Sequence, residues 1–486
     1  MHSSRGNPAE PKEDNDARTS FERKMRRAKV PEAVIDLFTS YLEQLQSSTS
    51  QGLIPEEDIR PVSPGDLPHQ THLTSRHREI GEKALSETVY IKLNGGLGTS
   101  MGMPYAKSLL EVKPGVTFLD IILRQSEAQA SDTDGLPLVF MNSFNTAKDT
   151  ADYLESKGIP RERQPLSFIQ HQYPKILADS LEPATNPDDP ELEWNPPGHG
   201  DIYAALYTSG ILETLLDMGK RYAFVSNSDN LGATVDPALL GYFVNEERPF
   251  LMEVALRTAS DKKGGHLALS GNGGLLLREI AQCPEKDLYA FQDIQRYGYF
   301  NTNNVWLDLR YLKETIQKNG LPRLPLIVNP KTLNPRDESS PKVFQLETAL
   351  GSAISIFENS GAVEVLRERF IPVKKTNDLL AIRSDAYVFS EEYQLIPSPK
   401  RVCGPLRIDL DMEVYKKIDQ FEARFPEGPP SLMACESLEV KGDVLFEADV
   451  VCKGAVSIRN EASEQKHIAR GSVLSGELTL GDGPAE

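Results

Sequence analysis

A glycine-rich stretch with a lysine behind it, residues 91–108, carries the residue types most suited to chemistry in this chain. Four glycines fall within eight positions: Gly95, Gly96, Gly98 and Gly102. Glycine allows positive φ angles and close approach to a ligand, and consecutive bare N–H groups can cradle an anion. With Lys107 behind it, the loop predicts a phosphate site. A tight strand-to-helix turn with a surface lysine is the other interpretation, and neither Gly-x-Gly-x-x-Gly nor a final Gly-Lys-Ser/Thr occurs here.

An aspartate, Asp229, follows a second apolar run, 222–226, which is typical of a buried strand. A carboxylate at the end of such a strand suits Mg²⁺, because that ion prefers one or two carboxylates together with phosphate oxygens. The alternative for an isolated aspartate here is a helix N-cap or a turn. Asn227 and Ser228 lie beside it and extend the polar cluster.

Two further segments carry side chains that could contact a nucleotide. In Pro196–Tyr203, His199 stands between two glycines, and Asp201 can cap the helix expected next. An imidazole in this position can donate a hydrogen bond to a phosphate or a hydroxyl group. Gln170 offers an amide, which both donates and accepts as the edge of uracil requires. A structural histidine and a solvated loop glutamine are the alternatives.

Taken together, these stretches resemble the eukaryotic-type UTP–glucose-1-phosphate uridylyltransferase (UDP-glucose pyrophosphorylase) family. The loop Leu93–Thr99 with Lys107 looks like the signature loop of that family, and Ser226–Ala233 resembles its metal-binding stretch. Segment 370–380 resembles the stretch with the second phosphate-binding lysine of the family, a role that falls on Lys374. Ordered matches of this kind continue from about residue 90 to 385 and more weakly beyond.

The resemblance implies a role for each matching residue. Nucleotide contacts would come from Leu93, Asn94, Gly95, Gly96, Lys107, Gln170, Gly198, Asp229 and Lys374. Contacts to the sugar and its phosphate would come from Gly95, Gly96, His199, Asn227, Ser228, Asp229, Glu279 and Asn303. Lys107 and Lys374 would be catalytic, and Asp229 would hold Mg²⁺. For Glu279 and Asn303, a purely structural role in the core is the alternative.

The composition of the chain argues against some classes of binding partner. The 486 residues include 71 acidic and 53 basic side chains, and the net charge of −18 argues against nucleic acid and anionic membranes as partners. No apolar run approaches the roughly 18 residues of a membrane span, and no signal peptide is evident. The four cysteines show no Cys-x-x-Cys spacing and read as reduced thiols. We therefore expect a soluble cytoplasmic protein.

The elements that must position these residues alternate between strand and helix from about residue 88 to 310. Apolar runs predict strands at 89–93, 109–112, 136–141, 222–226 and 250–256, and helical spacing predicts helices at 117–127, 146–157 and 203–218. Such alternation indicates an α/β fold with a mostly parallel sheet, whose ligands bind beyond the carboxyl ends of the strands. The resemblance implies a Rossmann-like, mixed-sheet nucleotidyltransferase domain of the GT-A-like type.

Three domains are expected: an N-terminal helical extension over 1–80, a catalytic domain over 81–385, and linker helices with a C-terminal β-domain over 386–486. Residues 1–22 are polar enough to predict disorder, and helical spacing indicates one helix from about 21 to 45. In the last domain, helices are expected near Tyr393 and over 412–424. Three Gly-x-apolar-x-apolar repeats, starting at Gly442, Gly454 and Gly476, then favour a left-handed β-helix-like solenoid. An antiparallel β module is the alternative.

The sequence thus predicts an enzyme that forms UDP-glucose and pyrophosphate from UTP and glucose 1-phosphate with the help of Mg²⁺. Two other functions remain open: a UDP-N-acetylhexosamine pyrophosphorylase, or a catalytically silent sugar-nucleotide sensor on the same fold. An open end on the C-terminal domain would leave an unpaired strand edge. Together with the resemblance, this predicts a homo-oligomer that associates through this domain.

Overall fold

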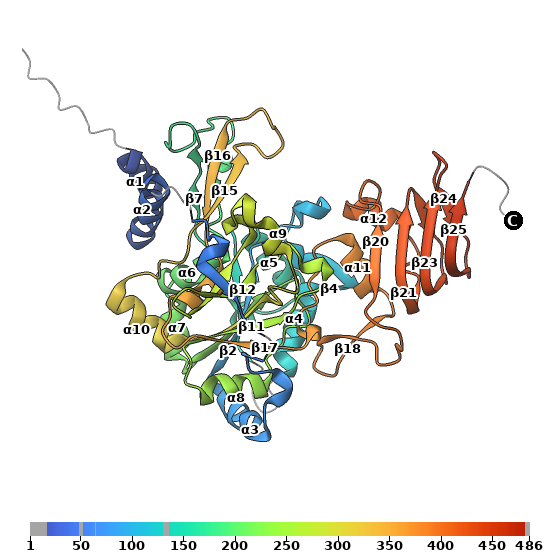
Figure 1. Cartoon of the computed structure of the whole chain (residues 1–486), viewed down its shortest axis with the longest axis horizontal. Helices are drawn as coiled ribbons and strands as arrows, with labels where there is room; N and C mark the ends of the chain where they lie inside the picture. Colours follow the sequence, from blue (N-terminus) through green and yellow to red (C-terminus); the bar gives the residue numbers. More distant parts are fainter. Residues whose placement is uncertain (1–16, 48–51, 64, 130–135, 482–486) are drawn as a thin grey trace, which may run out of the picture.

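The computed structural model describes residues 17–47, 52–63, 65–129 and 136–481. Across these residues, the centre of the molecule is a ten-stranded mixed sheet (Figure 1). Its main path runs through β1 (Ile59–Pro61), β12 (His266–Ser270), β14 (Tyr299–Asp308), β10 (Tyr222–Asn227), β2 (Thr88–Asn94), β5 (Leu138–Asn142) and β6 (Leu166–Ile169). Three more strands join beside it: β11 (Phe250–Leu256), β13 (Leu275–Arg278) and β17 (Gly361–Glu364).

The centre of this sheet is parallel and buried on both faces. β10, β2, β5 and β6 are parallel neighbours, whereas β14 is antiparallel to β10. Successive side chains of a strand point to opposite faces. Accordingly, Tyr90 and Phe224 enter one hydrophobic core, and Val89 and Val225 enter the other. The predicted mixed α/β fold is therefore confirmed.

Helices cover both faces and bring the loops of the sheet together at one edge. The helices of the central region are α3 (Ser75–Ala84), α4 (Phe118–Ala128), α5 (Ala147–Ser156), α6 (Ile202–Thr208), α7 (Ile211–Asp217), α8 (Pro237–Asn245), α9 (Leu288–Gln292), α10 (Leu309–Asn319) and α11 (Thr376–Arg383). The smaller strands are β3 (Glu111–Lys113), β4 (Val116–Thr117), β7 (Tyr173–Pro174), β8 (Ile176–Leu177), β9 (Trp194–Asn195), β15 (Ile327–Thr332) and β16 (Lys342–Glu347). Within the described ranges, no helix is both long and apolar enough to cross a bilayer.

Two predicted elements of this region are wrong in detail. The helix expected over 203–218 is broken between α6 and α7, because Gly210 takes a left-handed conformation with φ +77°. The strand expected over 109–112 starts later: Lys107–Leu109 form a single 3₁₀ turn, and β3 follows. That turn places the Lys107 side chain over the end of β10 rather than on a sheet edge.

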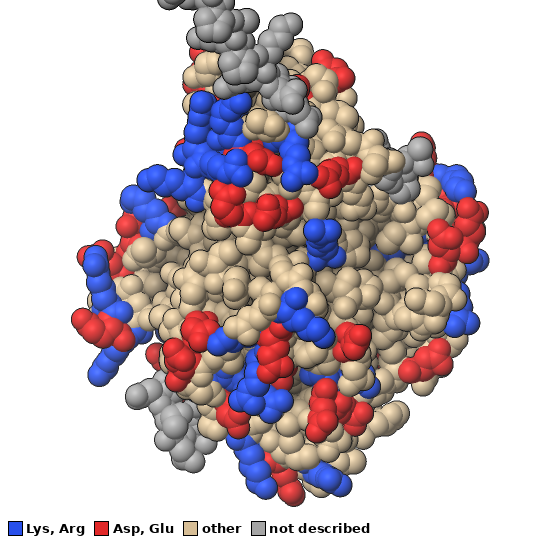
Figure 2. Space-filling model, turned by 90° about the vertical axis from the view of Figure 1, so that its left-hand side faces the viewer, with Lys and Arg blue, Asp and Glu red and all other residues tan. Residues whose placement is uncertain are grey.

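The N-terminal segment folds as two helices rather than one. α1 (Ala17–Arg27) and α2 (Glu32–Ser47) are separated at Lys29, whose φ is +59°, and by the following Val30-Pro31. The predicted disorder is therefore wrong for 17–22, and 1–16 lie outside the described residues. Basic side chains gather near these helices beside acidic ones (Figure 2), and ion pairs between α1 and α2 account for part of this pattern.

The C-terminal strands stack away from the central sheet (Figure 1). β20 (Arg407–Leu410), β21 (Ser431–Lys441), β23 (Val451–Asn460) and β25 (Val473–Leu480) form one parallel sheet. β22 (Val444–Phe446) and β24 (Lys466–Ile468) form a second parallel pair. Parallel pairing contradicts the antiparallel alternative.

The linker before these strands differs from the prediction. Tyr393 lies in the turn between β18 (Tyr387–Phe389) and β19 (Leu395–Pro397), not in a helix. The helix expected over 412–424 is reduced to α12 (Ile418–Arg424). Residues 412–414 form a turn instead, and Tyr415 after them is buried, with its hydroxyl donating to the carbonyl oxygen of Val444 over 2.6 Å.

Candidate active site

The glycine-rich loop begins where β2 ends. Lys107 N–H donates to the carbonyl oxygen of Gly96 over 3.1 Å, and a bridge between Leu97 and Ala106 closes the loop. Among the four glycines, only Gly102 has a positive φ, +78°. At Gly95 the reason for glycine is space, because a Cβ there would lie 2.9 Å from Nε2 of Gln170. Gly96 is exposed, with no described atom within 4 Å of a Cβ, so its backbone is open to a ligand.

Asp229 lies in the turn after β10, directly opposite this loop. Ser228 N–H donates to the carbonyl oxygen of Leu93 over 3.0 Å, which joins the two strand ends. Nζ of Lys107 donates to Oδ2 of Asp229 over 2.6 Å, and the two side chains are only 15% and 18% exposed. The structure therefore brings the predicted lysine and the predicted carboxylate into one ion pair at the carboxyl edge of the sheet.

Asn303 reaches the same place through an irregularity in β14. The pairing of β11 with β14 shifts register between Glu253 and Val254, and Asn303 has a φ of +61°. A bulge of this kind re-aims a side chain. Nδ2 of Asn303 donates to Oδ1 of Asn227 over 2.8 Å, while its own Oδ1 is buried without a partner among the described residues. An unsatisfied buried oxygen next to Asn227 is what a site awaiting a donor would show.

Lys374, the second predicted lysine of the site, lies just before α11. Its backbone N–H donates to Oδ2 of Asp378 over 2.7 Å, which fixes the start of that helix, while its side chain is exposed. Burial raises the pKa of Asp378, and the nearby Lys107 and Lys374 ammonium groups oppose this rise. Both lysines therefore lie within electrostatic range of one carboxyl group.

Glu279 lies in a recess against Gly265, where a Cβ would be 2.5 Å from its carboxylate. Burial raises the pKa of Glu279, and Lys374 opposes this rise. Glu279 therefore shares the electrostatic environment of Lys374. The structure places it near the predicted site, although it does not join the Asn227–Asn303 contact.

His199 is held in one tautomer by the neighbouring segment. Its Nδ1 accepts the N–H of Leu350 over 2.8 Å, so the ring proton resides on Nε2. Burial lowers the pKa of His199 to about 4, so the ring stays neutral at physiological pH. Gly198 beside it has a φ of +78°, and a Cβ would lie 2.4 Å from the carbonyl oxygen of Thr348. A close approach that only glycine permits thus presents a neutral N–H donor.

Gln170 and Asn94, two further candidates for nucleotide contact, are both anchored to Asn142. The side chain of Gln170 lies beside Gly95, and its backbone N–H donates to the carbonyl oxygen of Asn142 over 2.8 Å. Asn94 is buried, and its Nδ2 donates to Oδ1 of Asn142 over 2.8 Å and to Oγ1 of Thr150 over 2.9 Å. Both amide protons of Asn94 are thus used to fasten β2 to β5 and α5.

The site can accommodate a divalent cation at Asp229. Its Oδ1 is buried and has no hydrogen-bond partner among the described residues, and Oδ2 carries the Lys107 contact. Over the described part of the chain, no group of three His, Cys, Asp or Glu side chains is placed to hold a metal. One free carboxylate oxygen suits Mg²⁺, which takes its other ligands from phosphate and water.

Two residues outside the predicted set, His171 and Lys92, make polar contacts next to the site. Nδ1 of His171 lies 2.8 Å from Oδ1 of Asp201, whose Oδ2 accepts the backbone N–H of His171 over 2.6 Å. Asp201 does stand at the N-cap position of α6, but its side chain makes no capping bond because it binds His171 instead. Lys92 lies inside β2, within the strand predicted over 89–93. A lysine in the middle of an otherwise apolar strand is the sequence signal that points to a buried polar role for it.

Lys92 is fully buried beneath the Asp229 turn. Its Nζ donates to Oγ of Ser226 over 2.9 Å and lies 3.5 Å from the carbonyl oxygens of three residues of the same turn: Asn227, Asn230 and Ala233. Burial lowers the pKa of Lys92 to about 7, although Asp229 opposes the shift. The ammonium group of Lys92 therefore supports the turn that carries Asp229 from inside the core.

This lowered pKa predicts a pH-dependent effect of Lys92→Met. Between pH 7 and the ordinary lysine pKa of about 10.4, the unfolded chain binds more protons at this position than the folded chain, so the Lys92 contribution to stability rises with pH. We expect the melting temperature of wild type to exceed that of Lys92→Met by a margin that grows from pH 7 to pH 9.5. Lys318→Met, at an exposed lysine of α10, is the control, and its margin should stay constant. A constant margin for Lys92→Met would contradict the shift.

A glycine-rich loop beside a lysine–carboxylate pair, at the carboxyl edge of a mixed α/β sheet, is the arrangement of a nucleotidyltransferase. Comparison with known proteins narrows this class. The family model described as UTP–glucose-1-phosphate uridylyltransferase matches residues 35–453. The chain belongs to this family, and the predicted family membership is confirmed.

The relatives cover nearly the whole chain. The UTP–glucose-1-phosphate uridylyltransferase of Hordeum vulgare is 40% identical over 435 residues, which is 89% of this chain and 87% of the relative. The enzyme of that name from Saccharomyces cerevisiae is 36% identical over 458 residues, 94% of this chain and 90% of its own. A crystal structure of a mutant UDP-glucose pyrophosphorylase from Leishmania major, in complex with UDP-glucose, is 43% identical. It has a TM-score of 0.88 and covers 96% of this chain and 99% of its own.

Proposed function

We propose that this protein is a uridylyltransferase that converts UTP and glucose 1-phosphate to UDP-glucose and pyrophosphate, reversibly. The observation that carries the proposal is the Lys107–Asp229 pair, set opposite the glycine-rich loop, with both Lys107 and Lys374 in electrostatic range of the Asp378 carboxyl group. The likeness to relatives of that name along most of the chain supports the choice of substrates.

The reaction needs positioning and charge neutralisation rather than a protein nucleophile. A phosphate oxygen of glucose 1-phosphate attacks the α-phosphorus of UTP in line, the bond from that phosphorus to the bridging oxygen breaks, and pyrophosphate leaves with the electron pair. Lys107 and Lys374 offset negative charge on the reacting phosphates. Asp229 would hold Mg²⁺, and the ion would supply further neutralisation of phosphate charge.

The surrounding residues orient the two substrates. The backbone of Leu93, Asn94, Gly95 and Gly96 lies at the nucleotide, and the Gln170 amide reads the uracil edge. Gly198 gives close approach, and His199 donates its Nε2 proton to a phosphate. Asn227, Ser228, Asn303 and Glu279 provide fixed donors and acceptors for the hexose.

A panel of sugar 1-phosphates tests this proposal. With UTP and Mg²⁺, we expect pyrophosphate release with glucose 1-phosphate and much slower release with N-acetylglucosamine 1-phosphate. A preference for the acetamido sugar would favour the hexosamine pyrophosphorylase alternative. Binding of UDP-glucose without pyrophosphate release from any sugar would favour the sensor. Retention of Lys107, Asp229 and Lys374 supports the enzyme over the sensor.

The expected division into 1–80, 81–385 and 386–486 is also part of the proposal. Its C-terminal part we take to be a β-solenoid, because the chain alternates between the two parallel sheets as it passes from β21 to β25. Gly442, Gly454 and Gly476 have positive φ angles, as tight corners require. Val444, Phe446, Val456 and Ile458 fill the interior between the sheets.

The end of this solenoid predicts the mode of self-association. β25 is the last strand of its sheet within the described residues, and Val473 on it is 60% exposed. An unpaired edge with exposed apolar side chains favours pairing with a second copy. We expect light scattering to show an oligomer for wild type and a monomer for Val473→Glu. Val402→Glu, at an exposed valine before β20, is the matched control and should remain oligomeric.

A point substitution is preferable to deletion of the domain. Leu432, Leu438 and Val440 belong to the same hydrophobic core as the central sheet, so truncation near Pro430 would open that core. A wild-type monomer would overturn the proposed association. So would an oligomer of Val473→Glu as stable on dilution as the wild-type oligomer.

A further inference from the structure

Asn230 is a fully buried amide directly after Asp229. Its Oδ1 accepts the N–H of Ile371 over 2.9 Å, and its Nδ2 donates to the carbonyl oxygen of Arg369 over 3.0 Å. These are the bonds that the backbone of an adjacent strand would form with residues two apart. The side chain of Asn230 therefore acts as a short piece of strand, which joins the Asp229 turn to the segment before Lys374.

The backbone continues the same connection. Asn230 and Pro372 form an antiparallel bridge, and Val373 N–H donates to the carbonyl oxygen of Asp229 over 3.2 Å. Alternate residues, 369, 371 and 373, thus bond to the turn, and Lys374 is the next residue. These three hydrogen bonds join the Asp229 turn to the segment that leads to Lys374, and Nη2 of Arg369 adds a bond to the carbonyl oxygen of Thr234 over 2.9 Å.

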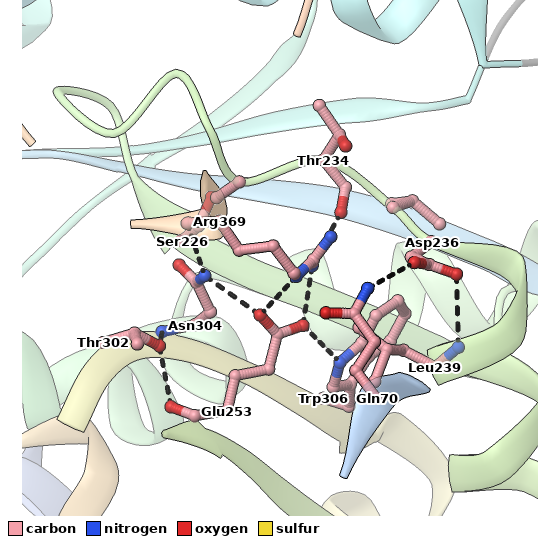
Figure 3. Close-up of polar contacts among 12 residues, drawn as sticks. Gln70, Ser226, Thr234, Asp236, Leu239, Glu253, Thr302, Asn304, Trp306 and Arg369 are labelled. Atoms are coloured by element: carbon pink, nitrogen blue, oxygen red, sulfur yellow. Dashed lines mark hydrogen bonds and ion pairs between the residues drawn. The ribbon is translucent and has the colours of Figure 1, made fainter. Parts of the chain in front are cut away.

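The far end of this connection is fixed in the core. Nε and Nη2 of Arg369 donate to the two carboxylate oxygens of Glu253 over 2.8 and 2.7 Å, and Figure 3 shows this pair with its neighbours. Asn304 and Trp306 on β14 also donate to that carboxylate, over 3.1 and 3.0 Å. Bidentate, charge-assisted bonds in a dry core are strong and directional. Arg369 is therefore held rigidly against β11 and β14.

We infer that Asn230 is a positioning residue for uridylyl transfer, which sets the spacing between Asp229 and Lys374. This inference rests on the proposed function. In the proposed reaction Asp229 and Lys374 both act at the reacting phosphates, so their separation decides whether both can engage one transition state. A misplacement of about 1 Å costs about 10²-fold in rate in well-ordered sites.

Gln125 provides a matched control. It is a fully buried amide as well, and its Nε2 donates to the carbonyl oxygens of Leu231 and Tyr393 over 2.9 and 3.0 Å. It therefore holds the same turn but leads to the β18–β19 hairpin instead of Lys374. We expect Asn230→Ala and Gln125→Ala to lower the melting temperature similarly. Only Asn230→Ala should lower kcat, by about 10- to 10²-fold.

A double-mutant cycle separates positioning from general loosening. If Asn230 acts by positioning Lys374, the effect of Asn230→Ala should largely disappear in the Lys374→Met background. There we expect Asn230→Ala to lower kcat by less than about threefold, because the effects of interacting residues are not additive. Gln125→Ala combined with Lys374→Met serves as the additive reference. Losses that multiply in the Asn230→Ala, Lys374→Met protein would overturn the inference.

Hydrogen exchange gives a readout that does not depend on activity. In the ligand-free protein, Asn230→Ala should speed exchange of the Ile371 and Val373 amides, whereas Gln125→Ala should not. An active wild type with an unaffected Asn230→Ala kcat refutes the positioning role alone. A wild type without pyrophosphate release refutes the proposed function as well, whatever the exchange result. If Asn230→Ala does not fold, Asn230→Ser takes its place in each comparison.

Discussion

Lys374→Met is expected to lower kcat for UDP-glucose formation by about 10²–10³-fold, the loss found when one preorganised donor to developing charge is removed. The folded state should persist, since the Lys374 side chain is exposed and only its backbone N–H bonds to Asp378. The KM for UTP should rise less than kcat falls, because the contact strengthens as charge moves during transfer. Steady-state kinetics and a melting curve measure both effects.

Lys375→Met is the control for this experiment. Lys375 is the adjacent exposed lysine, and its backbone N–H also bonds to Asp378, over 2.9 Å. Its removal changes the same net charge one position along, so kcat should stay within about threefold of wild type. A larger loss in Lys375→Met than in Lys374→Met would move the role to Lys375.

Lys107 differs from Lys374 because it already has a partner. Its removal leaves the largely buried Asp229 carboxylate without its ion pair, so Lys107→Met should lose turnover and also some stability. Among the described residues, Lys374 has no carboxylate partner at ion-pair distance to leave behind, which is why its variant gives the cleaner measurement.

The sequence was most informative where local pattern and burial agree. The apolar runs at β2, β5, β10 and β11 could be read directly, since strands buried on both faces are nearly continuous in apolar residues. Because the ends of such strands meet at one edge, the loop after β2 and the turn after β10 were expected to lie near each other. The 2.6 Å contact between Lys107 and Asp229 fits that expectation.

The features that the sequence did not reveal depend on details of the backbone or on contacts with residues far away in the chain. The break at Gly210 needs a left-handed residue, but a glycine inside a helical pattern does not by itself reveal one. The bulge that re-aims Asn303 follows from pairing with β11, some fifty positions earlier. Asp201 has the residue type of a cap, yet a histidine thirty positions before it takes its carboxylate. Asn230 looks like a turn residue until its partners at 369 and 371 are seen.

Asp229→Asn should raise the Mg²⁺ concentration at half-maximal activity at least about tenfold and lower kcat at saturating Mg²⁺ by about 10²-fold. The change is nearly isosteric, and an amide oxygen can still accept from Nζ of Lys107, so the turn should keep its place. However, the buried Oδ1 that has no partner among the described residues is the atom available to a cation. In the variant, one of the two oxygens becomes an NH₂ group, which repels a cation.

Asp236→Asn is the matched control for this substitution. Asp236 lies on the same connection after β10, but its Oδ1 accepts the N–H of Ala238 over 2.7 Å as the cap of α8. An asparagine caps a helix nearly as well, but its NH₂ group cannot accept the bond that Nε2 of Gln70 donates to Oδ2 over 2.9 Å. Stability should therefore fall slightly, whereas the Mg²⁺ titration should stay close to wild type. The comparison separates loss of a cation ligand from loss of a negative charge in this part of the protein. A Mg²⁺ midpoint in Asp229→Asn equal to that of Asp236→Asn would show that Asp229 does not hold the cation.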